Sequence, residues 1–123
     1  MLRTRVVFFR EEDGSAPLLD WLDTLPMKAQ DKCSERIERL RELGHLLRRP
    51  EADYLRDGIY ELRVKDERIN YRMLYFFHGQ EAVVLSHGTV KQQAAVPPRE
   101  IERAIARKRA FQRAPERHTL EAP

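Results

Sequence analysis

The pattern of apolar and polar residues predicts a strand and two helices in the first half of the chain. Residues 3–10 are rich in β-branched and aromatic side chains and end at a polar turn cluster, which indicates a first strand. Ser15 is placed to cap a short helix with a wide apolar face, and Pro26 ends that helix. Across residues 27–43 apolar side chains recur at spacings of three and four, so this segment predicts an amphipathic helix that ends at Gly44.

Strand patterns fill the next part of the chain. Residues 45–57 have no sustained period and contain Pro50, so we expect a connecting loop. Apolar and charged residues alternate over 59–65, as in a strand with one buried face. Residues 69–77 are nearly all apolar or aromatic, which is typical of a central strand covered on both sides. A further strand is predicted over 82–91.

The C-terminal part predicts one more helix. Pro97 and Pro98 open it, and its outer faces carry mostly Arg, Lys and Glu. Short turns between strands make antiparallel neighbours. The predicted fold is therefore α+β, with a small twisted, mainly antiparallel four-stranded sheet, two N-terminal helices and a C-terminal helix. We expect a single domain over residues 1–113 and a flexible tail over 114–123, which lacks an apolar period.

Composition narrows the class of protein. A chain of 123 residues with 41% hydrophobic content fits one compact domain. Although 35% of the residues are charged, the net charge is only +3, so total charge is a weak sign of nucleic-acid binding. Cys33 is the only cysteine, which excludes an intramolecular disulfide and suits a reducing compartment. The apolar run at 6–9 is too short for a signal peptide or a membrane span, so we expect a cytoplasmic protein that does not contact a membrane.

The sequence contains no familiar metal or nucleotide motif. Its four histidines are scattered, without a paired spacing or an accompanying carboxylate cluster. Its five glycines are isolated and form neither a phosphate-binding loop nor a nucleophile elbow. We therefore expect no bound metal and no cofactor.

The informative polar residues lie on the predicted strands. Arg63 projects from the charged face of its strand, Arg72 interrupts an apolar strand, and Lys91 ends the next one, so the three cations could form an anion-binding face. Simpler interpretations remain open, because Arg63 could be a solvated cation and Lys91 could mark a strand end. Arg72 needs a partner or a cleft, since an unpaired buried charge is costly, and Glu61 is a candidate for an internal ion pair. His87 could be a hydrogen-bonded histidine near the core.

Three runs of sequence resemble the phage-derived, HigB-like branch of the RelE/ParE toxin superfamily. They are Gly58-Ile59-Tyr60-Glu61-Leu62-Arg63, Tyr71-Arg72-Met73-Leu74-Tyr75-Phe76 and His87-Gly88-Thr89-Val90-Lys91. Supporting matches are Leu19-Asp20-Trp21-Leu22, the following Leu25-Pro26, and the helix start Pro98-Arg99-Glu100-Ile101. The likeness runs from the first strand to about Arg109, in the family's order of elements.

The resemblance implies a toxin of a two-gene toxin–antitoxin system, most often a ribosome-dependent messenger RNA endonuclease. Its partners would be a cognate antitoxin, expected to be a helix-turn-helix protein encoded next to it, and messenger RNA on the ribosome. The family's basic active-site positions would fall on Arg63, Arg72 and Lys91. Additional contacts to nucleic acid are expected from Lys65, Arg68 and His87.

These residue types suit metal-free RNA cleavage, in which the ribose 2′-hydroxyl attacks the adjacent phosphate. Arg63 and Arg72 would clamp the charged phosphate through paired donors, while Lys91 neutralises developing charge or assists the leaving 5′-oxygen. The general base is unassigned; His87 is the nearby residue with a suitable unperturbed pKa, although many RelE relatives work without histidine. No tyrosine follows Tyr75, so the C-terminal aromatic acid of RelE-type relatives is missing.

Two other functions remain open at this stage. The chain could be a non-enzymatic, ParE-like inhibitor of DNA gyrase, or a catalytically silent phage-derived module that binds nucleic acid or an antitoxin. Arg63, Arg72 and Lys91 favour the endonuclease. We expect the antitoxin to cover either the charged sheet face or the first two helices, because an acidic segment suits a cationic surface.

Overall fold

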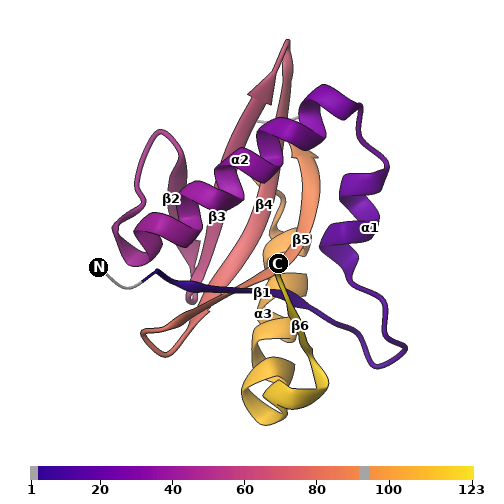
Figure 1. Cartoon of the computed structure of the whole chain (residues 1–123), viewed down its shortest axis with the longest axis vertical. Helices are drawn as coiled ribbons and strands as arrows, with labels where there is room; N and C mark the ends of the chain where they lie inside the picture. Colours follow the sequence, from indigo (N-terminus) through magenta and orange to yellow (C-terminus); the bar gives the residue numbers. More distant parts are fainter. Residues whose placement is uncertain (1–2, 92–94) are drawn as a thin grey trace.

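The computed structural model describes residues 3–91 and 95–123, which form one six-stranded sheet with helices on both faces (Figure 1). In chain order the elements are β1 (Arg5–Phe9), α1 (Pro17–Asp23), α2 (Met27–Leu43), η1 (Gly44–Leu46), β2 (Ala52–Arg56), β3 (Ile59–Asp66), β4 (Ile69–His78), β5 (Ala82–Lys91), α3 (Pro98–Arg113), η2 (Pro115–Arg117) and β6 (Thr119–Glu121). Within this described part, no helix combines the length and the apolar character that crossing a membrane requires.

The predicted α+β class is confirmed, but the sheet has six strands and not four. Its order is β2-β3-β4-β5-β1-β6, and every neighbouring pair is antiparallel except β1 with β5. The strand β2 lies in the segment that was expected to be a loop. It pairs with β3 from Ala52 opposite Leu62, and a register shift between Tyr54 and Arg56 breaks the regular alternation by which a strand is recognised in sequence.

The prediction of a flexible C-terminal tail is also wrong. Thr119–Glu121 form β6 at the edge of the sheet, antiparallel to β1, and Ala122 N donates to Val6 O at 3.1 Å. The His118 ring stacks on Phe9 with centroids 4.8 Å apart. These contacts join residues more than 100 positions apart, so the local sequence pattern carries no sign of them.

The first helix begins differently from the sequence prediction. Ala16, and not Ser15, occupies the N-cap of α1, and no side chain caps this end. Ser15 instead donates from its backbone N and its Oγ to Asp13 Oδ1, at 2.9 and 2.7 Å. A serine before a helix can hydrogen-bond either to the end of the helix or to a preceding turn, and Ser15 bonds to the turn.

Two apolar layers form the core, one on each face of the sheet. On one face α1 and α2 pack over inward-facing strand residues that include Leu62, Met73 and Leu85. On the other face α3 packs over Ile59, Leu74, Phe76 and Val84, among others. Figure 1 shows α2 crossing one face of the sheet with α3 on the opposite side. Cys33 is fully buried in the first layer, and burial raises the pKa of its thiol to about 11.

Three of the sequence runs that carried the family resemblance meet in this core. Gly88 of β5 lies against the Trp21 ring of α1, and a Cβ at this glycine would come within 2.1 Å of that ring. Trp21 also meets Tyr71 edge to face, with centroids 6.1 Å apart. Gly88 is therefore required by close helix-to-sheet packing.

Candidate functional site

The strand register places the predicted cations on one face of the sheet, the face that α3 partly covers. Directly opposite residues of antiparallel strands share a face, and so do residues two apart on one strand. Two neighbouring cross-strand rows result, and they contain Arg63, Arg72 and Thr89, and then Lys65, Asn70 and Lys91. Arg63, Arg72 and Lys91 therefore share one face of the sheet, with Lys91 in the row next to the two arginines.

Glu61 contacts both arginines. Its side chain is almost fully buried, and its Oε2 accepts a hydrogen bond of 2.8 Å from Arg63 Nε. Its Oε1 lies 3.2 Å from Arg72 Nε, which confirms the ion pair considered for Arg72. Asp53 adds a longer contact of 3.4 Å to Arg63 Nη2. One buried carboxylate thus fixes both guanidinium groups side by side.

Arg72 is a buried cation in the centre of the sheet. It is 6% exposed, and its Nη1 donates to its neighbour's backbone oxygen, Tyr71 O, at 3.1 Å. Burial lowers the pKa of the Arg72 guanidinium, the Glu61 carboxylate opposes that change, and Arg63 adds to it. Because an arginine pKa starts far above neutrality, Arg72 remains charged at pH 7.

Arg63 and Arg72 line a hollow of about 320 Å³ beside β3, which we name the β3 hollow. Its lining residues are Arg36, Pro50, Glu51, Arg63, Val64, Lys65, Asn70 and Arg72. The hollow lies where the pairing of β2 with β3 ends: the register stops at Ala52 opposite Leu62, and Arg63 N donates to Glu51 O at 2.8 Å. The lining contains four cations and one carboxylate, as expected of a site for an anionic group.

The other residues predicted to contact RNA lie in different places. Lys65 is exposed and lines the β3 hollow, whereas Arg68 is exposed in the turn between β3 and β4. Lys91 is half-buried at the end of β5 and does not line the hollow. Within residues 3–91 and 95–123, Lys91 forms no ion pair.

His87, which was predicted to contact RNA, is a buried histidine. His87 lies on the same sheet face as Thr89 and Lys91, where α3 covers it; its Nδ1 lies 2.8 Å from Ser86 Oγ and its Nε2 lies 3.1 Å from Glu100 Oε1. Burial, helped by the nearby Arg107, lowers the pKa of His87 to about 4. The ring is therefore neutral at pH 7, and both its nitrogens already have partners.

Among the residues that sequence reasoning did not identify, Arg36 and Asp53 contact Arg63 directly. The Arg36 Nη1 on α2 donates to the backbone oxygen of Arg63, and its Nε lies 3.5 Å from Glu51. Arg36 occupies the polar side of an amphipathic helix, where any charged residue fits the pattern. Only the packing of α2 along the edge of β3 brings it to the hollow.

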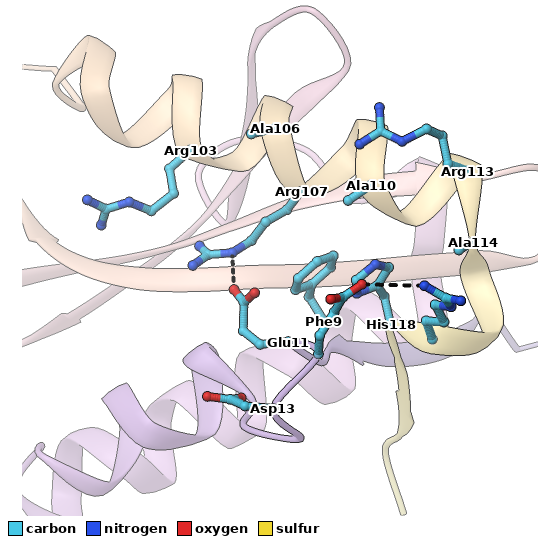
Figure 2. A pocket seen from close by; sticks show the side chains of 12 residues that line it. Phe9, Glu11, Asp13, Arg103, Ala106, Arg107, Ala110, Arg113, Ala114 and His118 are labelled. Atoms are coloured by element: carbon cyan, nitrogen blue, oxygen red, sulfur yellow. Dashed lines mark hydrogen bonds and ion pairs between the residues drawn. The ribbon is translucent and has the colours of Figure 1, made fainter.

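A hollow larger than the β3 hollow lies elsewhere, between α3 and the connection from β1 to α1 (Figure 2). This α3 groove, of about 910 Å³, is lined by Phe9, Glu11, Glu12, Asp13, Arg103, Ala106, Arg107, Ala110, Arg113, Ala114, Arg117 and His118. Arg107 Nε donates to Glu11 Oε1 at 3.1 Å, and Arg117 Nη1 lies 3.6 Å from Glu12. None of the predicted site residues lines it.

The described residues offer no obvious place for a metal ion, because they contain no group of three or more His, Cys, Asp or Glu side chains arranged as ligands. The polar chemistry of the β3 hollow is that of guanidinium and ammonium donors.

Comparison with protein families gives one match. The model of the family described as phage-derived protein Gp49-like (DUF891) matches residues 20–109. This range runs from α1 into α3 and includes every strand residue that lines the β3 hollow. A search of curated proteins finds no match.

Proposed function

The chain belongs to the phage-derived Gp49-like family, within the RelE/HigB-like toxin superfamily, and from this premise we propose that it cleaves messenger RNA on the ribosome at the β3 hollow. Proteins of this family are generally toxins of toxin–antitoxin systems, which implies an antitoxin as partner. The endonuclease activity, the ribosome and the catalytic residues belong to the proposal.

The observation that carries the proposal is the pair of arginines held by opposite oxygens of Glu61. Arg63 uses Nε and Nη2 toward carboxylates, and Arg72 uses Nε toward Glu61 and Nη1 toward a backbone oxygen. No described residue accepts a hydrogen bond from Arg63 Nη1 or Arg72 Nη2. These two groups are the donors we assign to a phosphate in the hollow.

The reaction we propose needs no metal ion. The 2′-oxygen forms a bond to the adjacent phosphorus and loses its proton, the bond from phosphorus to the 5′-oxygen breaks, and that oxygen gains a proton. The products are a 2′,3′-cyclic phosphate and a 5′-hydroxyl. Negative charge grows on the phosphoryl oxygens during attack, and Arg63 and Arg72 stabilise it with donors fixed in advance.

The lysines of the next row have supporting roles in this proposal. Lys65 lines the hollow, where it adds positive charge next to Arg63. Lys91 lies on the same face, two strands from Lys65, with Asn70 between them. We assign Lys91 to a phosphate beside the cleaved one, because it does not line the hollow itself. Arg68 in the turn extends the same basic surface.

Cleavage of a defined message on purified ribosomes, followed by primer extension, tests the proposal. Arg63→Ala and Arg72→Ala should each slow cleavage roughly 100- to 1,000-fold, the cost of losing donors to a transition-state oxyanion. Arg63→Lys should recover part of the rate, because an ammonium cannot make the two-pronged contact. Arg109→Ala, an exposed arginine on α3, and Glu116→Ala are the matched controls and should cleave like the wild type.

Circular dichroism must show that the variants are folded before their rates are compared. If folded Arg63→Ala and Arg72→Ala cut at the wild-type rate, the site assignment is wrong. Pulse labelling after induction gives an independent measurement, and protein synthesis should stop before DNA synthesis. The opposite order, with no cleavage of any message by the wild type, would replace the endonuclease with the gyrase inhibitor.

A further inference from the structure

A second hollow adjoins the β3 hollow on the side of α2. It has a volume of about 420 Å³ and is lined by Lys32, Glu35, Arg36, Arg39, Glu51, Val64 and Lys65. Four of these residues, Arg36, Glu51, Val64 and Lys65, also line the β3 hollow. The two hollows therefore form one continuous depression, the α2 track, which runs from the paired arginines past the free edge of β3 to α2.

The helix side of the α2 track is a row of cations. Lys32, Arg36 and Arg39 follow one another at spacings of four and three residues, which places them on one side of α2. Their side chains are 40%, 28% and 47% exposed, so all three reach solvent. With Arg63, Lys65 and Arg72, the two hollows contain six cations against the two carboxylates of Glu35 and Glu51.

Neighbouring acceptors hold these cations in place. Lys32 Nζ lies 2.9 Å from Asp66 Oδ1, and Arg39 donates to the two oxygens of Glu51 at 3.0 and 2.9 Å. Among the described residues, Arg39 Nη1 has no acceptor. The carboxylates orient the row and leave donors of each cation for a ligand.

We propose that the α2 track binds the single-stranded RNA chain next to the cleaved bond, with Lys32, Arg36 and Arg39 at successive phosphates. This inference rests on the proposed function and names where the substrate lies beyond the reacting phosphate. Arg36, the middle cation of the row, also lines the hollow that would hold the cleaved phosphate, so one extended strand reaches both. Contacts to phosphates do not select bases, so the α2 track sets the position and affinity of the strand.

Binding of a fluorescent 2′-O-methyl RNA oligonucleotide, which cannot be cleaved, tests the track by anisotropy at several salt concentrations. Arg39→Ala and Lys32→Ala should each weaken binding severalfold. Each should also reduce the slope of log affinity against log salt by about 0.7, the value for one phosphate contact on a single strand. Arg109→Ala removes the same kind of charge from α3 and should leave both quantities unchanged.

Removing an acid from the track should have the opposite effect. Glu35 is exposed, and it forms no ion pair in the part of the chain that the structure describes. Glu35→Gln should therefore tighten RNA binding without changing the melting temperature. Glu42→Gln, an exposed acid of α2 outside both hollows, is the matched control. A purely structural role of the row gives no reason for tighter binding.

Three outcomes would overturn the inference while leaving the proposed function in place. In the first, the wild type cleaves ribosome-bound messages but does not bind the oligonucleotide. In the second, Arg39→Ala and Arg109→Ala weaken binding equally. In the third, the α2 variants bind RNA normally but lose the antitoxin, which would assign the track to a protein. If the wild type neither binds nor cleaves RNA, the proposed function itself fails.

Discussion

The β3 hollow and the α3 groove both bring arginines and carboxylates together, but the acids are related to the cations in different ways. In the β3 hollow Glu61 lies two residues from Arg63 on the same strand, and its two oxygens contact the Nε atoms of Arg63 and Arg72. In the α3 groove Glu11 and Arg107 are 96 residues apart, and their ion pair connects two elements across the opening. Figure 2 shows this contact spanning the groove.

The comparison separates two uses of an ion pair. A carboxylate that contacts the Nε atoms of neighbouring arginines orients them and leaves terminal nitrogens for a ligand, as Glu61 does with Arg63 and Arg72. A carboxylate on a different element uses a donor of the cation to connect two parts of the fold, as Glu11 does with Arg107 of α3. The volume of a hollow therefore does not indicate a ligand site in this protein, since the larger α3 groove is spanned by ion pairs between its own residues.

The largest effect is expected from Glu61→Leu. It would leave Arg72 buried without its carboxylate, and breaking a buried pair in this way costs about 3–5 kcal/mol. Urea unfolding should show this loss in the free energy of unfolding. Glu61→Gln keeps an acceptor oxygen, so it should lose less stability while still slowing RNA cleavage. A Glu61→Leu protein with wild-type stability would show that Arg72 does not depend on this pair.

A change in the α3 groove should lower the free energy of unfolding and leave the rate of RNA cleavage unchanged. Arg107 is mostly buried; it binds Glu11, its Nη1 donates to Ser86 Oγ at 3.4 Å, and it lies over the Phe9 ring. Arg107→Met should lower the free energy of unfolding by about 1–3 kcal/mol, because charged hydrogen bonds and a cation–π contact are lost. The folded fraction should cleave RNA at the wild-type rate. Slower cleavage at unchanged stability would make the groove part of the site.

The sequence predicted the fold best where local pattern and tertiary position agree. The bounds of α2 match the periodic segment, and Pro98 opens α3 as expected, because helix periodicity and proline chemistry are local. The strand β6 escaped prediction because only three residues and their pairing with β1 define it. The strand β2 escaped because its irregular register removes the alternation.

The candidate site divides in the same way. Alternation along β3 and the exception in β4 identified Arg63 and Arg72, and the need to pair a buried charge identified Glu61. Arg36 and Asp53 could not be identified, because they reach the site through the packing of α2 and β2 along the sheet edge. His87 lies within a matching motif and on the same sheet face as Lys91, but α3 covers it and Glu100 contacts its ring, and a motif does not report which part of a sheet face a helix covers.

The dependence of stability on pH tests the contact between His87 of β5 and Glu100 of α3. The folded-state pKa of His87 is about 4, below the unfolded value of about 6.5, so the unfolded chain binds the extra proton first. The contribution of neutral His87 is therefore complete above pH 6.5 and is lost as the pH falls toward 4. Between pH 7 and 5 the loss is about 2 kcal/mol, or roughly 5 to 10 °C in melting temperature.

His87→Gln should remove this part of the pH dependence. Its melting temperature should be lower than that of the wild type at pH 7, because the contact to Glu100 changes, and should fall less between pH 7 and 5. Ionisable groups that do not contact position 87 are unchanged between the two proteins, so the difference between the two curves isolates the histidine together with its contact to Glu100. Parallel curves would mean that His87 is not buried in its neutral form.

The smallest effect is expected from Arg117→Ala at the mouth of the α3 groove. Arg117 and Glu12 are 69% and 72% exposed and 3.6 Å apart, and exposed pairs of this kind contribute at most about 1 kcal/mol and often nothing measurable. Its melting temperature, RNA cleavage and neutralisation by the antitoxin should all match those of the wild type, whereas Arg107→Met changes stability alone. Because Arg117→Ala leaves the fold intact, weaker neutralisation by the antitoxin could not be attributed to unfolding. That single result would show that the groove binds a partner and that its cations, like those of the β3 hollow, are available to a ligand.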